Sequence, residues 1–436
     1  KLIIWNIFNA DFETSANRLR AHYPIEKKRH SRVRIAIPDE PLPDGRLYAV
    51  LPSDTRLSLP FHIDADFFPS SDRKRIDLET GYQAEWNKAA IEAAARAVAY
   101  NLKRLPDMLG HVGLWRFIEQ LDATRQATER GTQNAVFAAF WREVAPLLTR
   151  ATIVRTSAGG WIEPAKARLL ESQAEQDAQP FLERLGIPVV HPDLRPFFGL
   201  MRQSEIGVPL LSVDDVVEGL TRVKMVSGIP IAEAPAGLRD SSSWNLLWKA
   251  LDAIQNRRPQ SQETISSSWR KIQLASLAVS QDKRVYRPSE LFRGDKKTRE
   301  VFLQVTWLHS SIGDGSIPGN CVPEFGLLEA LEYLESERDE LEVAGQLGQL
   351  DVVGLFRWLE HNRAHTELSV EERRRLLSLP LYPHGDKLLP LEQLFLPSNF
   401  EDPVSVANVL DIQVLGVTRD FLRSLGVAEL TFANYV

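Results

Sequence analysis

The sequence predicts an α+β fold followed by mixed, helix-rich domains, and three of its features carry that prediction. Short apolar runs alternate with polar turns through the first part of the chain, a pattern typical of β-strands. An alanine-rich segment at Gln83–Leu105 follows and favours one long helix. Later, at Pro164, Pro288 and Pro390, a short strand pattern leads through the proline into a short helix pattern.

Composition limits the class of protein. The 436 residues, 44% hydrophobic and 25% charged, are ordinary for a globular protein and enough for about two to four domains. The net charge of −6 argues against a protein that coats nucleic acid. The single cysteine, Cys321, excludes an internal disulfide and favours a reducing, cytoplasmic compartment. No apolar run reaches the roughly 18 residues that a membrane span requires.

Residues 1–110 are expected to form the first domain. Its expected elements are a buried strand at Leu2–Phe8, a helix at Phe12–His22, strands at Val33–Ile37, Leu47–Leu51 and Leu59–Phe67, and then the long helix. That helix is expected to stop at Pro106, because proline lacks the N–H that a helix interior requires.

Two further helix-rich α+β domains are expected at 111–240 and 241–436. The elements expected in the first of them are helices at Val112–Leu121 and Thr132–Leu148 and a hairpin at Thr152–Ile162. Arg239–Ser243 marks the boundary, since its serines are suited to cap a helix at Trp244–Ile254.

The three proline-marked segments predict a repeated hairpin-helix unit. They are Trp161–Leu170, Val285–Phe292 and Leu388–Phe395. Proline suits the first turn of a helix, because its missing N–H would have no partner there. Two of the three segments are followed by a helix that ends at a glycine, Gly186 or Gly426, where a left-handed C-cap is expected. The spacing of the prolines is too irregular for a solenoid, so a reused module is the interpretation.

The strand predicted at Leu59–Phe67 alternates strictly between apolar and polar residues. Its polar face carries His62, Asp64 and Asp66, whose side chains have the donor atoms of a metal site or an acid–base site. The solvated face of an edge strand has the same pattern and is the commoner case. No metal site is therefore expected.

The segment after this strand, Phe68–Ile76, combines hydroxyl groups with cations. Its candidate site residues are Ser70, Ser71, Arg73, Lys74 and Arg75. The planar guanidinium of arginine matches the geometry of phosphate oxygens, and backbone N–H groups in such a loop add further donors. The sequence therefore indicates a loop able to hold a phosphate group.

These residues also carry a family resemblance. The segments Gly45–Pro52, Leu59–Ile63, Phe67–Arg75 and Trp86–Asn87 resemble, in this order, a pattern that recurs in the sacsin repeat region after its chaperone-like ATPase domain. More weakly, the proline-marked segments and Leu379–Tyr382 are similar to other sacsin pieces. The chain thus resembles part of a sacsin-like protein of the GHKL superfamily, which includes gyrase, MutL and the heat-shock chaperones.

The resemblance implies that residues 1–110 form a ribosomal-S5-like, transducer-type domain. In that superfamily such a domain supplies a cation to the γ-phosphate of ATP, which is bound with Mg²⁺ in a preceding domain. The resemblance assigns this role to Arg73, with Arg75 as a substitute. The supporting contacts it implies are those of Ser70, Ser71 and Lys74. ATP and Mg²⁺ are thus expected in the intact protein and not in this chain alone, which has no P-loop pattern.

Three functions stay open. In the first, the chain couples the nucleotide state of its own N-terminal ATPase domain to a protein client or partner, with a homodimer as one assembly. Asp64 and Asp72 stand where sacsin-like chains usually have Asn or a neutral residue, which adds negative charge near the phosphate. The second function is accordingly a non-catalytic scaffold in a quality-control or bacterial defence protein. The third, with the least weight, is nucleic-acid binding through the basic cluster Lys27–Arg34.

Overall fold

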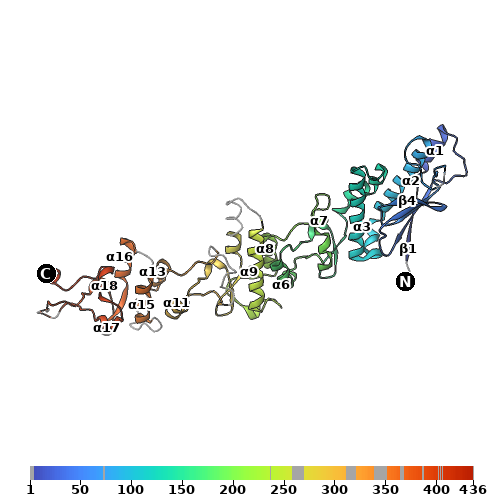
Figure 1. The fold of residues 1–436 in the computed structure, drawn as a ribbon. Helices are drawn as coiled ribbons and strands as arrows, with labels where there is room; N and C mark the ends of the chain where they lie inside the picture. The colour runs from blue at the N-terminus through green and yellow to red at the C-terminus, as the bar shows by residue number, and fades with distance from the viewer. Residues whose placement is uncertain are drawn as a thin grey trace. The chain divides into compact units, whose positions relative to one another are not determined.

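A computed structural model describes residues 4–71, 74–235, 237–257, 270–310, 321–337, 351–363, 368–384, 387–400, 402, 404 and 406–435. The chain divides into two compact units, Lys1–Val216 and Val217–Val436. Both combine helices with small sheets, so the chain is α+β, as the sequence predicts (Figure 1). Among the described helices, none is both long enough and apolar enough to cross a membrane. The division into 1–110, 111–240 and 241–436 stays a prediction.

The first unit begins with a five-stranded sheet in the order β1-β2-β5-β3-β4. The strands are β1 (Trp5–Asp11), β2 (Arg32–Pro38), β3 (Gly45–Ala49), β4 (Leu51–Leu57) and β5 (His62–Ala65). Neighbouring strands are antiparallel except β3 and β5, which are parallel. One face of the sheet is covered by the alanine-rich helix α2 (Gly81–Tyr100), which contacts β1, β2 and β5 (Figure 1).

Three predicted strands differ from the structure, and one of them, Leu59–Phe67, is shorter than expected, since only His62–Ala65 forms β5. The run Leu47–Leu51, expected to be one strand, is divided at Val50, whose positive φ of 71° turns the chain from β3 into β4. The first strand was expected to be buried, but Phe8 is the single buried residue of β1. The other face of β1, with Trp5 and Ile7, is exposed, because α2 covers only the face of the sheet that carries Phe8.

The long helix ends earlier than the sequence predicts, and Pro106 begins the next helix. α2 stops at Tyr100, and the 3₁₀ turn η1 (Leu102–Arg104) leads into α3 (Leu105–Glu129) with Pro106 in its first turn. Proline is tolerated there because the first N–H groups of a helix have no partner within it. α3 is interrupted at Gly110, which has φ 64° and ψ 179°.

The first unit has a hydrophobic core whose buried residues extend from Phe8 to Val208. Its further elements are α1 (Glu13–His22), η2 (Ala135–Phe137), α4 (Ala138–Leu148), β6 (Val154–Arg155), β7 (Trp161–Ile162), η3 (Pro164–Lys166), α5 (Gln173–Asp177), α6 (Gln179–Arg184), η4 (Pro192–Phe197), α7 (Phe198–Met201) and the start of α8 (Val213–Arg222). The hairpin predicted at Thr152–Ile162 is β6–β7. The helix predicted from Thr132 begins only at Ala138, after η2.

The second unit contains two small sheets, β8-β10-β9 and β11-β12, among short helices. Its elements are β8 (Ile229–Pro230), η5 (Ile231–Glu233), α9 (Ser241–Asn256), β9 (Ala278–Val279), β10 (Arg284–Tyr286), η6 (Pro288–Glu290), α11 (Lys296–Val301), α13 (Leu327–Ser336), α15 (Val352–Arg363), α16 (Val370–Ser378), β11 (Pro380–His384), β12 (Lys387–Pro390), η7 (Leu391–Gln393), α17 (Ile412–Leu415), α18 (Arg419–Leu425) and α19 (Phe432–Tyr435). Asp240 caps α9 in place of the expected serine, since its carboxylate accepts the N–H of Ser242 at 3.2 Å.

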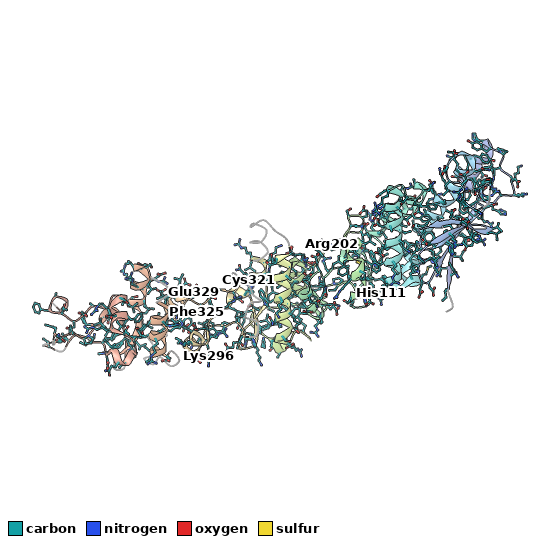
Figure 2. The ribbon with its side chains drawn as sticks, in the orientation of Figure 1. His111, Arg202, Lys296, Cys321, Phe325 and Glu329 are labelled. Atoms are coloured by element: carbon teal, nitrogen blue, oxygen red, sulfur yellow. The ribbon has the colours of Figure 1, made fainter. Side chains whose placement is uncertain are left out.

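The core of this unit is rich in aromatic rings. Phe302, Phe325 and Trp358 contact one another, with ring centroids 4.8, 5.0 and 6.3 Å apart; Phe325 is labelled in Figure 2. Such edge-on and tilted contacts are the geometries that aromatic side chains prefer. Because the three rings come from separate segments of the unit, their packing joins these segments into one core.

Each of the three proline-marked segments contains residues of the second strand of a hairpin and then one 3₁₀ turn: β6–β7 and η3, β9–β10 and η6, and β11–β12 and η7. Pro164 and Pro288 are the first residues of their turns, whereas Pro390 is the last residue of β12 and lies one position before η7. Gly186 and Gly426 have φ of 72° and 110°. Both glycines therefore take the left-handed conformation that the sequence predicts.

A two-residue extended arm follows each of these 3₁₀ turns. The arms are Arg168–Leu169, Phe292–Arg293 and Phe395–Leu396. The two residues of each arm pair in parallel with two different later segments. The partners of the first arm are Val189 and Leu210, those of the second arm are Trp307 and Glu324, and those of the third arm are Val409 and Glu429. Both residues of every arm donate their N–H and accept at their C=O, with N···O distances of 2.8–3.1 Å.

Gly45 should be essential for the sheet, because its backbone lies against the end of β5. A Cβ at this position would lie 1.9 Å from the carbonyl oxygen of Phe61. We expect Gly45→Ala to lower the free energy of unfolding by about 1–3 kcal/mol or more, the usual scale for overpacking a core. The control is Gly199→Ala on the exposed side of α7, where an added Cβ meets no atom within 4 Å and should not destabilise the chain. Urea unfolding of both variants measures the difference, and equal stabilities would contradict the prediction.

Candidate functional site

The candidate phosphate-binding segment forms a closed loop, Phe68–Asp77, here called the basic loop. An antiparallel bridge between Pro69 and Ile76 closes it. The hydroxyl of Ser70 donates to the carbonyl of Arg75 at 2.9 Å and accepts the N–H of Arg75 at 3.1 Å. Ser70 therefore holds the two sides of the loop together.

Asn87, on α2, fixes both ends of the basic loop. Asn87 is fully buried, with a relative exposure of 0%. The Oδ1 atom accepts the N–H of Phe68 at 2.8 Å, and Nδ2 donates to the carbonyls of Phe68 and Asp77 at 2.8 and 2.7 Å. One side-chain amide thus bonds to three backbone groups at the two ends of the loop, and its own polar atoms are paired inside the core.

Two further side chains fix the approach to the loop. The indole Nε1 of Trp86 donates to the carbonyl of Asp66 at 3.0 Å. The guanidinium of Arg29 donates to the carboxylate of Asp66 at 2.7 Å and to the carbonyl of Phe67 at 3.2 Å, and it lies 3.9 Å from the centre of the Phe68 ring. The ends of the basic loop are therefore held from α2 on one side and from the segment before β2 on the other.

The middle of the basic loop carries the predicted cations. Ser71, Lys74 and Arg75 are exposed. The carbonyl of Lys74 accepts the N–H of Asp54 at 2.7 Å, which attaches this side of the loop to β4. Arg73, with Asp72, lies outside the described residues. The structure thus brings Ser70, Ser71, Lys74 and Arg75 into one turn, and their role toward a phosphate stays a prediction.

The alternation predicted for Leu59–Phe67 is confirmed. The apolar residues of this segment, which includes β5, are all buried, namely Leu59, Phe61, Ile63, Ala65 and Phe67. On the opposite face, Asp64 pairs with Arg34 and Asp66 pairs with Arg29. These ion pairs use two arginines of the Lys27–Arg34 cluster, which reduces the basic surface available to a nucleic acid.

His62 precedes the two carboxylates on the same strand face but has a different environment. Its Nδ1 atom accepts the backbone N–H of Arg46 at 3.0 Å, and its ring stacks on Trp5 with centroids 5.3 Å apart. Burial, and then the positive charge of Arg46, hold the pKa of His62 below its ordinary value. The imidazole is therefore an acceptor at Nδ1 and neutral at physiological pH.

The outer face of the sheet is hollowed around His62. A groove with a volume of about 920 Å³ lies there, and its floor includes Tyr48 and Asp64. Trp5 and Ile7 line it as well, although they are 40% and 50% exposed. Large apolar side chains on a concave, half-exposed sheet face are typical of a contact surface.

Arg29 and Asn87 were not among the predicted site residues. Asn87 was visible in the sequence as part of the Trp86–Asn87 pair, and its polar side chain within an otherwise alanine-rich helix was the available signal. Arg29 gave no such signal, since it lies 37 positions from Asp66 inside a run of similar cations.

Comparison with known proteins found no match for this chain among protein-family models, curated proteins or solved structures.

Replacing Asn87 should release the basic loop. We expect Asn87→Ala to lower the free energy of unfolding, because each buried backbone group left without a partner costs about 1–3 kcal/mol. Amide hydrogen exchange at Phe68 should also become faster. Asn101→Ala is the matched control, because the Asn101 amide lies at the end of the same helix, donates to the carbonyl of Ala97 at 2.8 Å and accepts from the guanidinium of Arg104 at 3.2 Å, both away from the basic loop. Protection at Phe68 that is equal in the two variants would contradict the clamping role.

The lowered pKa of His62 predicts a dependence of stability on pH. Below its ordinary pKa of 6.5 the unfolded chain takes up a proton that the folded chain resists, so the free energy of unfolding should fall as the pH falls. His62→Asn keeps an acceptor near the Nδ1 position and should remove this part of the slope. Urea unfolding at pH values of about 7.5 and 5.5 tests it. His22→Asn, an exposed position on α1, should keep the wild-type slope.

Proposed function

We propose that this chain is part of a sacsin-like protein of the GHKL superfamily and couples the nucleotide state of a preceding ATPase domain to a protein client or partner. The observation that carries the proposal is the convergence of the family-like residues on one loop. Both Trp86 and Asn87 carry the resemblance together with the Phe67–Arg75 segment. Asn87 bonds to both ends of the loop that contains Arg73 and Arg75, and Trp86 contacts the Phe68 ring and the carbonyl of Asp66 just before the loop.

The physical requirement for such a role is a cation that reaches outward from a rigid support. The basic loop offers this combination, because hydrogen bonds from Asn87 hold its ends while Lys74 and Arg75 are exposed in its middle. We accordingly assign the γ-phosphate contact to Arg73, with Arg75 as a substitute. In this proposal, residues 1–110 act as the S5-like, transducer-type domain.

The proposal implies a set of ligands and partners. ATP and Mg²⁺ would be bound by the preceding domain, with Ser70, Ser71 and Lys74 supporting the phosphate contact from this chain. A client protein or a second copy of the protein would receive the signal. Cytoplasmic residence agrees with the single cysteine, which cannot form an internal disulfide. Burial raises the pKa of the Cys321 thiol to about 12, so the thiol stays protonated and inert.

A second candidate is a non-catalytic scaffold built from reused modules, and the three extended arms favour it. In each module a hairpin and a 3₁₀ turn precede an arm that pairs with two later segments. The residue just before the arm is buried in every case, namely Ala167, Leu291 and Leu394. We infer that these are repeats of one hairpin-helix unit, which would present similar surfaces at several places along a scaffold.

Hydrolysis by the longer protein separates the two candidates. If the coupling role is right, Arg73→Ala or Arg75→Ala should reduce ATP turnover by about tenfold or more, the usual scale for the loss of one charge-stabilising donor. The melting temperature should change little, because the side chain of Arg75 is exposed.

Arg96→Ala removes an equal charge from an exposed position on α2 and should leave turnover unchanged. Turnover that is normal in both loop variants of an active protein would exclude the coupling role and favour the scaffold. The 436-residue chain by itself should not hydrolyse ATP, since the Mg²⁺-binding and water-activating groups would belong to the preceding domain.

A further inference from the structure

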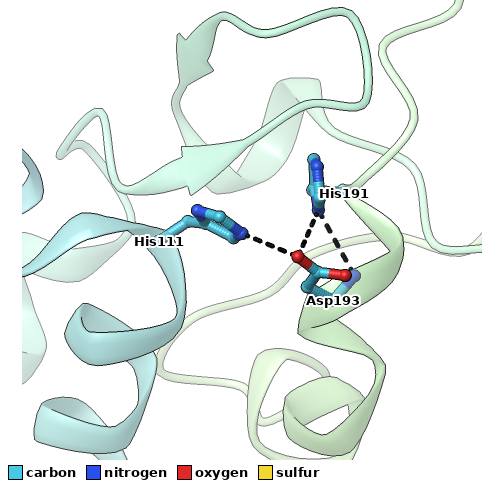
Figure 3. A group of neighbouring side chains, drawn as sticks. All are labelled: His111, His191 and Asp193. Carbon is cyan, nitrogen blue, oxygen red and sulfur yellow. Dashed lines mark hydrogen bonds and ion pairs between the residues drawn. The ribbon is translucent and has the colours of Figure 1, made fainter.

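Two histidines and an aspartate meet in the first unit, away from the basic loop. His111 is the residue after the break in α3 at Gly110, and Asp193 lies in η4 two residues beyond His191 (Figure 3). His111 and Asp193 are 82 positions apart in the sequence. Their proximity therefore depends on the packing of α3 against η4, two elements that are in contact.

The three side chains point toward one another. The Nε2 atom of His111 lies 3.2 Å from Oδ2 of Asp193, and Nδ1 of His191 lies 3.6 Å from the same oxygen (Figure 3). The two imidazole rings are 4.6 Å apart between centroids. One ligand atom from each residue, two nitrogens and one oxygen, fits within a span of 4.8 Å.

The chemistry of these atoms selects the kind of ion. Neutral imidazole nitrogens with one carboxylate oxygen are a donor set for zinc and similar transition-metal ions, whereas Mg²⁺ and Ca²⁺ prefer oxygen ligands alone. Tetrahedral zinc bonds of about 2.0–2.1 Å require ligand atoms closer together than 4.8 Å. Rotation of partly exposed side chains can supply this contraction, since 60% of the Asp193 side chain is exposed.

The local backbone leaves a ring nitrogen of both histidines available to bind a metal ion. Gly110, with φ of 64°, redirects the chain so that His111 begins the second part of α3. The Nδ1 atom of His191 accepts the N–H of Asp193 at 3.3 Å, a length beyond the usual 2.7–3.2 Å range. That hydrogen bond is weak, so little is lost when the nitrogen lone pair turns to a metal ion.

We propose that His111, His191 and Asp193 bind one divalent transition-metal ion of the zinc type, with water completing its coordination. The ion joins α3 to η4 and so fastens a segment that follows the β6–β7 hairpin to a helix that precedes it. It is a structural clip, because metal binding to a site that exists only in the folded chain stabilises that fold.

The test uses the full 436-residue chain after removal of metal with EDTA. Zn²⁺ should raise its melting temperature at a stoichiometry of one ion per chain, and Mg²⁺ should not. Co²⁺, as an optical probe, should give visible absorption bands that Zn²⁺ displaces.

His111→Gln and Asp193→Asn remove one ligand each. Neither change removes the hydrogen bond between the backbone N–H of Asp193 and Nδ1 of His191. Each should weaken Zn²⁺ binding by at least the roughly 10–100-fold that changes around a metal site produce. His384→Gln, at an exposed position in β11, should bind like the wild-type chain.

Two results would overturn the proposal. One is a chain whose melting temperature and Co²⁺ spectrum do not respond to these ions. The other is equal Zn²⁺ affinity in His111→Gln, Asp193→Asn and His384→Gln, which would show that the ion binds to histidines in general. Circular dichroism of each metal-free variant checks that a loss of binding is not a loss of folding.

Discussion

The hydrogen bonds of one buried side chain, Asn87, connect the elements on which the first unit depends. The amide lies in the fully buried part of α2, where an unpaired polar group would be costly. It avoids that cost by bonding to the backbone at Phe68 and Asp77, the two ends of the basic loop. The helix and both ends of the loop consequently share one set of bonds, so the position of the loop cations depends on how α2 packs on the sheet.

Local patterns in the sequence predicted the features that local burial determines. The strict alternation at Leu59–Phe67 is produced by one buried face, and the left-handed cap at Gly426 by the conformational freedom of glycine, so both were predictable. The turn at Val50 was not, because a β-branched residue with positive φ opposes its own local preference. Pro106 was expected to end the alanine-rich helix but lies in the first turn of α3, since proline marks both the end of one helix and the start of another.

The candidate sites were less predictable, because their partners come from distant parts of the chain. The sequence placed Ser70 and Arg75 in one loop, but it did not reveal that the Ser70 hydroxyl closes that loop on the Arg75 backbone. The contact between Arg29 and Asp66 spans 37 positions. His111 and His191 belong to no common motif, and only the packing of α3 on η4 brings them together.

The extended arms have a consequence for solubility during folding and assembly. A short strand with one unpaired edge can add a strand from another chain and so begin aggregation. In each arm, such as Phe292–Arg293, successive residues pair on opposite sides, and both sides are occupied by segments of the same chain. Neither edge of the arm is left as a template. A protein that carries several such arms can therefore contain many very short strands without offering these edges to its neighbours in a crowded solution.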